Sequence, residues 1–130
     1  MSIVVDTSVI IAVLTNEKNK NKLIKATRGK ELTAPIALHW EIGNAFSAML
    51  KRKRITLDLA KQAIGYYSQI PIKLQEISLS KSIEIANAFS IYAYDAYFLE
   101  CARVNNASLI SLDDKLVLAA KKMNLSVIEV

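Results

Sequence analysis

The sequence has few of the residues that interrupt regular structure or cross-link small proteins. It contains 3 Gly and 2 Pro in 130 residues, so we expect neither long linkers nor disordered segments. The single cysteine, Cys101, excludes an internal disulfide and is typical of a reducing compartment. With 52% hydrophobic residues, a chain of this length buries a substantial core, and we expect one domain over residues 1–130.

Long hydrophobic runs are also absent. The longest wholly apolar run covers residues 9–14, which is far too short to span a bilayer. The apolar run at the N-terminus is interrupted by Asp6 and has no basic start, so it does not resemble a signal peptide. We therefore expect a soluble, cytoplasmic protein that does not bind a membrane.

Acidic residues are fewer than basic ones. The chain has 12 Asp and Glu against 17 Lys and Arg, a formal net charge of +5. If some of the acids belong to one metal site, the excess of basic residues on the remaining surface is larger still. Such a surface favours an anionic polymer as partner, and the alternative is a basic protein with no role in nucleic-acid binding.

Short apolar runs alternate with longer helical patterns along the chain. The runs predict strands at residues 3–5, 32–34, 72–77, 108–112 and 126–130. Between them the pattern predicts helices over residues 7–15, 17–28, 36–52, 56–70, 80–91, 94–105 and 114–123. This order predicts an α/β fold, a single-domain three-layer α/β/α sandwich with a central parallel sheet. In such sheets, ligands bind at the carboxyl ends of the strands.

Four acidic residues lie within apolar segments, where an unpaired carboxylate is rarely buried. Two of them directly follow predicted strands, which places both at the carboxyl edge of the sheet. The economical shared partner is a divalent metal such as Mg²⁺ or Mn²⁺, because hard cations prefer oxygen ligands. The four residues are Asp6, Glu41, Asp95 and Asp113.

The segments that contain these acids resemble the PIN-domain ribonucleases, and among them the small VapC-type toxins of prokaryotic toxin–antitoxin pairs. The resemblance covers essentially the whole chain, and its strength lies in four motifs in the family order, since any one alone is weak. It implies a PIN-like fold, metal-dependent hydrolysis of RNA, a cognate antitoxin partner and a homodimer. The motifs are Val5-Asp6-Thr7-Ser8, Glu41-Ile42-Gly43-Asn44, Tyr94-Asp95-Ala96 and Ser111-Leu112-Asp113-Asp114-Lys115-Leu116.

The resemblance assigns graded roles to the acids. Asp6 and Asp95 are the expected metal ligands, and Glu41 binds the metal or its water. Asn44 lies three residues after Glu41 on the same helix face and is expected to orient it. The alternatives are a helix cap for Asp6, a helix-start acid for Asp95 and a solvated helix residue for Glu41.

The fourth motif leaves one choice open. Asp113 is the favoured fourth acid, although the adjacent Asp114 could share the role or act as a helix-start acid. Ser111 could orient Asp113 through its hydroxyl, or be a strand-end hydroxyl without function. Ser8, or Thr7, is expected either to bond to a metal-bound water or a phosphate, or to cap the helix that follows.

Two further groups are open to more than one interpretation. Lys51, Arg52, Lys53 and Arg54 end the helix that carries Glu41, about 15 Å away along its axis, and either contact RNA phosphates or complement the helix C-terminus. Several large side chains at helical spacing are expected to pack in the core. The alternative is that some of them line a homodimer interface or an antitoxin groove. Base stacking has no support in the sequence. These large side chains are Trp40, Phe46, Met49, Tyr66 and Tyr67.

One position departs from the family pattern. Where the family often has a small hydroxyl residue three positions before the third acid, this chain has Tyr92. The four acids are unaffected, but detailed contacts on the substrate side are not expected to copy those of the family.

Other functions fit the sequence less well. A PIN-domain RNA-processing nuclease outside a toxin pair, or an inactive PIN-like scaffold, shares the same fold. An aspartate-nucleophile phosphatase usually has a second Asp two residues after the first, where this chain has Ser8. A receiver-type binding module clusters two acids near its first strand. Here Ser2 and Ile3 precede Val4, and neither is acidic.

Overall fold

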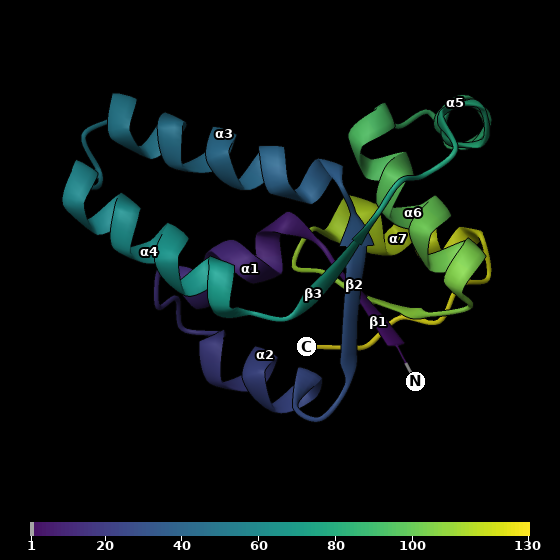
Figure 1. Cartoon of the computed structure of the whole chain (residues 1–130). Helices are drawn as coiled ribbons and strands as arrows, with labels where there is room; N and C mark the ends of the chain where they lie inside the picture. The colour runs from purple at the N-terminus through teal and green to yellow at the C-terminus, as the bar shows by residue number, and fades with distance from the viewer. Residues whose placement is uncertain (1) are drawn as a thin grey trace.

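The computed structural model describes residues 2–130, which form four strands and seven helices (Figure 1). The strands are all parallel and are ordered β3-β2-β1-β4 across one sheet. They are β1 (Ser2–Val5), β2 (Glu31–Pro35), β3 (Ile72–Gln75) and β4 (Ser108–Ile110). The helices are α1 (Thr7–Leu14), α2 (Lys20–Thr27), α3 (Ala37–Lys51), α4 (Leu57–Gln69), α5 (Leu79–Phe89), α6 (Ala93–Asn105) and α7 (Asp114–Lys122).

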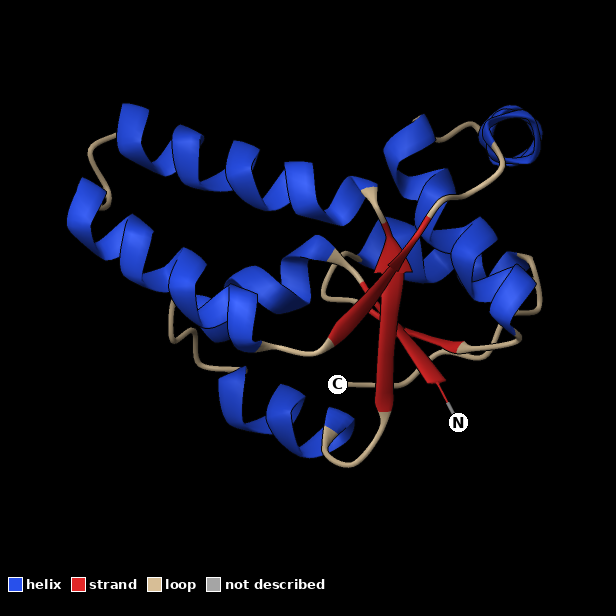
Figure 2. Cartoon of the chain, viewed as in Figure 1, coloured by secondary structure: helices blue, strands red, loops and turns tan. Residues whose placement is uncertain are grey.

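The helices cover the sheet in two layers. The chain runs from β1 to β2 to β3 in one direction, then returns to β4 on the far side of β1. Because crossovers between parallel strands are right-handed, this reversal puts α1 to α4 on one face and α5 to α7 on the other. Figure 2 shows the strands between these two groups. The predicted three-layer α/β/α sandwich with a central parallel sheet is therefore confirmed.

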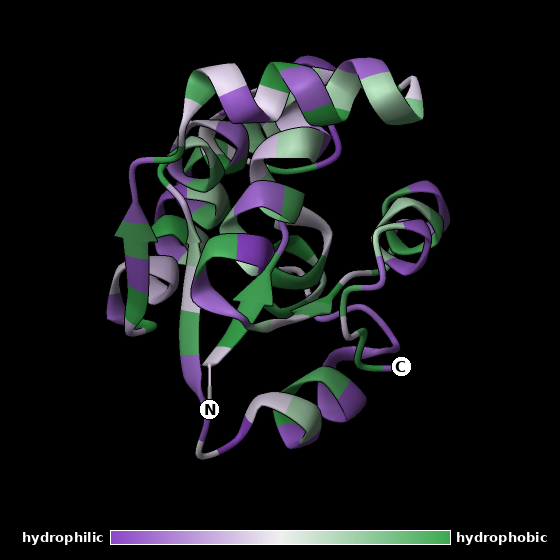
Figure 3. Ribbon diagram, turned by 90° about the vertical axis from the view of Figure 1, so that its right-hand side faces the viewer, coloured by the Kyte–Doolittle hydropathy of each residue, from purple (hydrophilic) through white to green (hydrophobic). Residues whose placement is uncertain are grey.

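The core follows from the apolar pattern of these elements. Ile3, Val4 and Val5 are all buried, as expected for a central parallel strand covered on both faces. On α3, the buried residues Leu38, Ile42 and Phe46 recur every four positions and form one apolar stripe. Figure 3 shows this contrast, with β1 largely hydrophobic and the helices alternating between hydrophobic and hydrophilic residues.

The C-terminal strand predicted over residues 126–130 does not form. Only a single parallel bridge joins Leu109 of β4 to Val127. It consists of hydrogen bonds from Leu109 N to Ser126 O, at 2.9 Å, and from Ile128 N to Leu109 O, at 2.8 Å. Both neighbours of the short apolar pair Val127-Ile128 are polar, so the segment has little apolar surface with which to extend the sheet.

The core prediction for large side chains is correct for some residues and wrong for others. Phe46, Tyr67 and Cys101 are buried. Trp40 is 68% exposed and Tyr66 is 62% exposed, so neither belongs to the core. Residues 2–130 contain no helix that is both long and apolar enough to cross a membrane.

Candidate active site

Asp6 lies where the neighbouring strands β1 and β4 end. From this point α1 and α7 run to opposite faces of the sheet. The Ser111 hydroxyl, at the end of β4, donates to Asp6 Oδ2 at 2.6 Å, and the Ser8 hydroxyl donates to Oδ1 at 2.6 Å. The Val9 N–H also donates to Oδ1, at 3.2 Å, so Asp6 is the N-cap of α1. The helix cap given as the alternative for Asp6 is therefore confirmed, and the cap at Thr7 or Ser8 is wrong. A sheet position of this kind is a ligand-binding crevice in open α/β folds.

Asp113 is fixed by the same network of hydrogen bonds. Its own N–H donates to the Ser111 hydroxyl at 2.9 Å, and its Oδ1 accepts from Lys115 N at 3.0 Å and from Leu116 N at 3.5 Å, which makes Asp113 the N-cap of α7. The Leu112 N–H donates to the Ser8 hydroxyl at 3.0 Å, which ties the end of β4 to the start of α1. The carboxylates of Asp6 and Asp113 thus have fixed positions.

Asp114 differs from its neighbour. Its side chain is exposed and belongs to the first turn of α7, and among residues 2–130 it has no side-chain hydrogen bond or ion pair. The structure therefore joins Asp113, and not Asp114, to the network around Asp6.

Glu41 approaches from α3 and is the most perturbed acid of the group. Burial raises its pKa to about 7, and the negative charges of Asp6 and Asp95 add to the rise. The Thr7 hydroxyl opposes the rise, but its geometry falls short of a hydrogen bond, so Thr7 Oγ1 and Glu41 Oε2 are both buried without a partner. Unpaired buried polar atoms are costly, and two that face one site indicate a missing polar ligand there.

Asp95, in the first turn of α6, completes the group. Burial raises its pKa, the charge of Asp113 raises it further, and the Lys115 ammonium lowers it. Burial also raises the pKa of Asp6, against the hydrogen bonds from Ser111, Ser8 and Val9, and the charge of Asp113 adds to the rise. The four predicted acids are therefore close enough for their charges to act on one another, although they come from four separate parts of the chain.

This group is not a preformed ion cage. Within the described range, residues 2–130, no three Asp, Glu, His or Cys side chains lie close enough together to hold a metal as they stand. The donor set nevertheless fits a hard divalent cation, because it is all oxygen and includes the orphaned Glu41 Oε2. A cation would also offset the repulsion that adds to the effect of burial on the pKa values of Asp6, Glu41 and Asp95.

Other predicted residues lie apart from the acids or make no contact with them. Asn44 is exposed, and its side chain makes no hydrogen bond to Glu41, so nothing in the structure shows it orienting that carboxylate. The basic segment 51–54 is exposed at the far end of α3, where Arg52 is the C-cap. Both remain predictions with respect to function.

A second feature of the same sheet edge escaped sequence reasoning. A concave pocket of about 310 Å³ lies where β2 and β3 end and α3, α5 and α6 begin. Its lining includes Ile36, Trp40, Ile77, Leu79, Tyr94 and Tyr97, and none of its lining residues is charged. We call it the aromatic pocket. The one signal in the sequence was an aromatic residue directly before each of two acids, in Trp40-Glu41 and Tyr94-Asp95.

Comparison with known proteins assigns this arrangement to a class. A family model described as PIN domain matches residues 3–122, whereas the curated proteins give no match. The chain is similar to the crystal structure of PAE2754 from Pyrobaculum aerophilum, with a TM-score of 0.77 and 22% identity over 98% of this chain and 83% of that one. At this identity, the similarity shows that the two chains share a fold.

Two toxin-system structures also share the fold. VapBC2 from Rickettsia felis, bound to a DNA fragment from the promoter, is similar with a TM-score of 0.67 and 12% identity over 98% of both chains. VapC20 from Mycobacterium tuberculosis, described as a sarcin–ricin loop cleaving toxin, is similar with a TM-score of 0.64 and 13% identity over 90% of this chain and 94% of that one.

Proposed function

The chain belongs to the PIN-domain family, and from this premise we propose that it is a metal-dependent endoribonuclease that hydrolyses RNA phosphodiester bonds. PIN domains are generally nucleases, which agrees with a hydrolase. The observation that carries the proposal is the cluster of acids in which burial, and then the charges of neighbouring carboxylates, raise the pKa values of Asp6, Glu41 and Asp95. Asp6 and Asp113 also cap helices, but capping does not account for Glu41 and Asp95 beside them, whereas a shared cation does. Phosphodiester hydrolysis is a reaction that a divalent cation catalyses.

In this proposal Asp6, Glu41, Asp95 and Asp113 hold Mg²⁺ or Mn²⁺. The ion, when bound, supplies Lewis acidity that activates water and offsets the charge of the phosphate. Ser8 and Ser111 position Asp6, since each hydroxyl donates to a different carboxylate oxygen. Lys115, the cation that the structure places near Asp95, is available to the anionic substrate at the same crevice.

Asp6→Asn and Asp95→Asn test this function. Each substitution keeps the shape of the side chain but removes a charge, and we expect RNA cleavage with Mn²⁺ to fall by about 100-fold or more. Asp58→Asn is the matched control, because Asp58 is an exposed acid in the first turn of α4. Wild-type cleavage by both Asn variants would contradict the proposal, and so would a wild-type protein that shows no Mn²⁺ binding in calorimetry.

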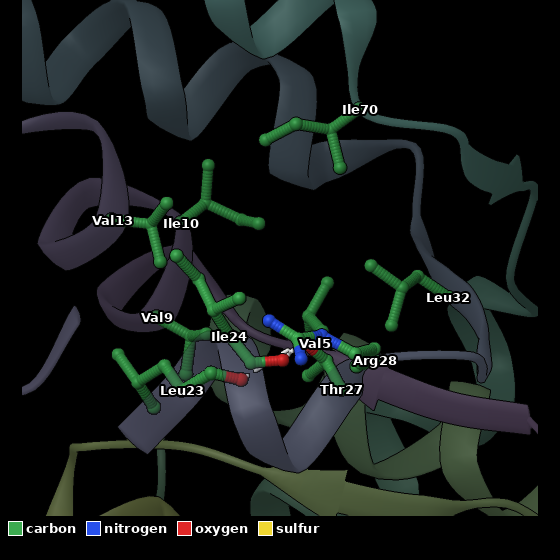
Figure 4. Close-up of a pocket in the computed structure, with 10 residues that line it drawn as sticks. All are labelled: Val5, Val9, Ile10, Val13, Leu23, Ile24, Thr27, Arg28, Leu32 and Ile70. Carbon is green, nitrogen blue, oxygen red and sulfur yellow. Dashed lines mark hydrogen bonds between the residues drawn. The ribbon is translucent and has the colours of Figure 1, made fainter. Parts of the chain in front are cut away.

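We further propose that the nuclease is a cytoplasmic toxin neutralised by a cognate antitoxin. An apolar pocket of about 240 Å³ lies between α1, α2 and the sheet. Figure 4 shows its lining, which includes Val9, Val13 and Ile24 together with Arg28. Helix α2 carries Lys20, Lys22 and Lys25 and no acidic residue. An amphipathic antitoxin segment with acidic flanks has the complementary chemistry.

The antitoxin proposal is testable at this pocket. Ile24→Glu puts a charge among the apolar lining, so growth inhibition by the toxin should resist rescue by the antitoxin. Gln62→Glu, at an exposed neutral position of α4, is the control for the same change in charge alone. Rescue of both variants to the same extent would contradict docking at this pocket.

Self-association is part of the same proposal. Large apolar side chains are exposed on α4, at Leu57, Leu59 and Ile64, and on α5, at Leu79 and Ile83. Surfaces of this kind are typical of proteins that associate. We expect a homodimer, which light scattering of the purified chain will measure.

A further inference from the structure

The carboxyl edge of the sheet has two halves of opposite character. Above the ends of β1 and β4 lie the acids, and above the ends of β2 and β3 lies the aromatic pocket. Figure 1 shows α3, α5 and α6 starting near the arrowheads of β2 and β3. The two halves are joined directly by the chain, because Trp40 precedes Glu41 on α3 and Tyr94 precedes Asp95 on α6.

The aromatic side chains of this half are largely exposed to solvent. Trp40 is 68% exposed and Tyr94 is 57% exposed, and both line the pocket. The Tyr94 ring meets the Tyr97 ring edge-on, with centroids 5.9 Å apart, which fixes one wall. Tyr92, the residue that departs from the family pattern, is 86% exposed at the start of α6 and makes no cap hydrogen bond. An aromatic surface therefore borders the side of the crevice that holds Glu41 and Asp95.

We propose that the aromatic pocket binds an unpaired nucleobase of the RNA substrate, next to the phosphodiester that is hydrolysed at the acids. The inference rests on the proposed nuclease function. Trp40 and Tyr94 line the pocket, and their chain neighbours Glu41 and Asp95 interact electrostatically. Because the Cα atoms of adjacent residues are about 3.8 Å apart, a strand whose phosphate reaches Glu41 and Asp95 has its neighbouring nucleotide within reach of Trp40 and Tyr94. Aromatic rings stack on any base, and this contact contributes a large part of single-strand binding.

The composition of the pocket determines what it selects. Its lining has no charged group, so it supplies no ion pair to a phosphate. The only side-chain hydrogen-bonding groups of its lining are the hydroxyls of Tyr94 and Tyr97 and the indole N–H of Trp40. Stacking on apolar and aromatic walls tolerates every base but requires that the base be unpaired. The pocket therefore selects single-stranded RNA over duplex without reading sequence. The competing occupant is a second copy of this chain, which would be detected as a change in oligomeric state and not in KM.

Trp40 is the only tryptophan of the chain and reports directly on the pocket. The probe is a single-stranded oligoribonucleotide added to the full chain in EDTA, which prevents metal-dependent cleavage. We expect the strand to quench the fluorescence of Trp40 and the same strand in a duplex not to do so. Failure to quench, while an independent filter assay shows that the strand is bound, would overturn the inference.

Kinetics give the second measurement. Trp40→Ala should raise KM for single-stranded RNA at least about fivefold, the lower end of the loss when one stacked base is released. The value of kcat should change less than about twofold. Trp40→Phe should restore most of the loss because it keeps a ring, and Tyr66→Ala is the matched control, an exposed aromatic on α4 outside the aromatic pocket.

The outcomes separate this inference from the proposed function. If the wild-type chain cleaves no RNA, the nuclease proposal fails. If it cleaves RNA and Trp40→Ala leaves KM unchanged, only the pocket assignment fails. If Trp40→Ala converts a dimer into a monomer in light scattering and leaves KM unchanged, the pocket holds a second copy of the chain and the assignment to RNA is overturned.

Discussion

The acidic and aromatic halves of the sheet edge are built by different physical means. In the acidic half, hydroxyl and backbone groups bond the oxygens of Asp6 and Asp113 at 2.6–3.5 Å, so these carboxylates have little freedom. In the aromatic half, Trp40, Tyr92 and Tyr94 are largely exposed and make no side-chain hydrogen bond among the described residues. The first arrangement suits chemistry that requires fixed charges, and the second suits binding of many similar surfaces.

This difference shows how one edge can separate catalysis from recognition. Substitutions in the acidic half should change the rate of cleavage or the stability of the fold. Substitutions in the aromatic half should change substrate affinity. The following predictions begin with the largest expected effect.

The sharpest test within the acidic half compares two adjacent acids. Asp113→Asn removes a charge that acts on Asp6 and Asp95, so we expect cleavage to fall by about 100-fold. Asp114→Asn changes an exposed acid outside that network and should cost less than about threefold. Single-turnover cleavage of one RNA by both variants measures this. Equal losses would mean that the pair shares the role of the fourth acid.

Ser111→Ala tests whether hydrogen bonds hold the acidic half together. The Ser111 hydroxyl both donates to Asp6 and accepts from Asp113 N, so its removal leaves a buried carboxylate oxygen and a backbone N–H without their partner. We expect unfolding free energy to fall by about 1–3 kcal/mol in urea denaturation. Ser111→Thr keeps the hydroxyl and should lose less. Equal unfolding free energies of the two variants would show that the Ser111 hydroxyl does not stabilise the fold.

The pH dependence of stability tests the repulsion between the acids. The folded-state pKa of Glu41 is about 7, above its ordinary value of 4.5, so the folded protein holds this proton more tightly than the unfolded chain does. The stabilisation is complete below pH 4.5 and is lost as the pH rises through about 7. The metal-free Tm should fall by a few degrees across this window, since ~1 kcal/mol shifts the Tm of such a domain by about 3–6 °C.

Two controls accompany that measurement. Glu41→Gln removes the titrating group and should flatten part of the decline, while the raised pKa values of Asp6 and Asp95 maintain the remainder. Mn²⁺ should restore the Tm of the wild type at pH 8 but restore less in the variant. A wild-type Tm that is independent of pH between 4.5 and 7 would show that Glu41 ionises normally.

The smallest effect is expected outside both halves, at the basic end of α3. The double substitution of Lys51→Ala and Arg54→Ala should raise KM about twofold and reduce its dependence on salt, because each side chain contributes a screened contact to a phosphate. The value of kcat should not change. A loss larger than that of Trp40→Ala would place the main binding contact at this end of α3 and not in the aromatic half.

Much of the fold followed from local pattern. The apolar residues Ile3 to Val5 indicated a central strand, and the order of elements indicated a parallel sheet, because both signals are carried by neighbouring residues. The final strand failed because one short apolar pair, Val127-Ile128, is enough for a bridge but too little for a strand. The cap of α1 was misplaced because Thr7, Ser8 and Asp6 are all good capping residues, and only the packed structure selects one.

The candidate site divides in the same way. The identities of the four acids were available from the sequence, because a carboxylate in an apolar segment is anomalous wherever it lies. The positions of Ser8 and Ser111 on opposite oxygens of Asp6 were not, since that contact joins residues 105 apart in the chain. The aromatic pocket was missed because Trp40 at helical spacing resembles a core residue, and exposure depends on which neighbours pack against it.

The place of β4 beside β1 also has a consequence in time. Asp6 is synthesised 105 residues before Ser111. Until β4 has been made, β1 has no neighbour on that side of the sheet, and Asp6 lacks the hydrogen bond from Ser111. Under the proposed function, the acids are therefore not assembled for hydrolysis while the chain before β4 is being translated, and a partner protein has that interval in which to bind.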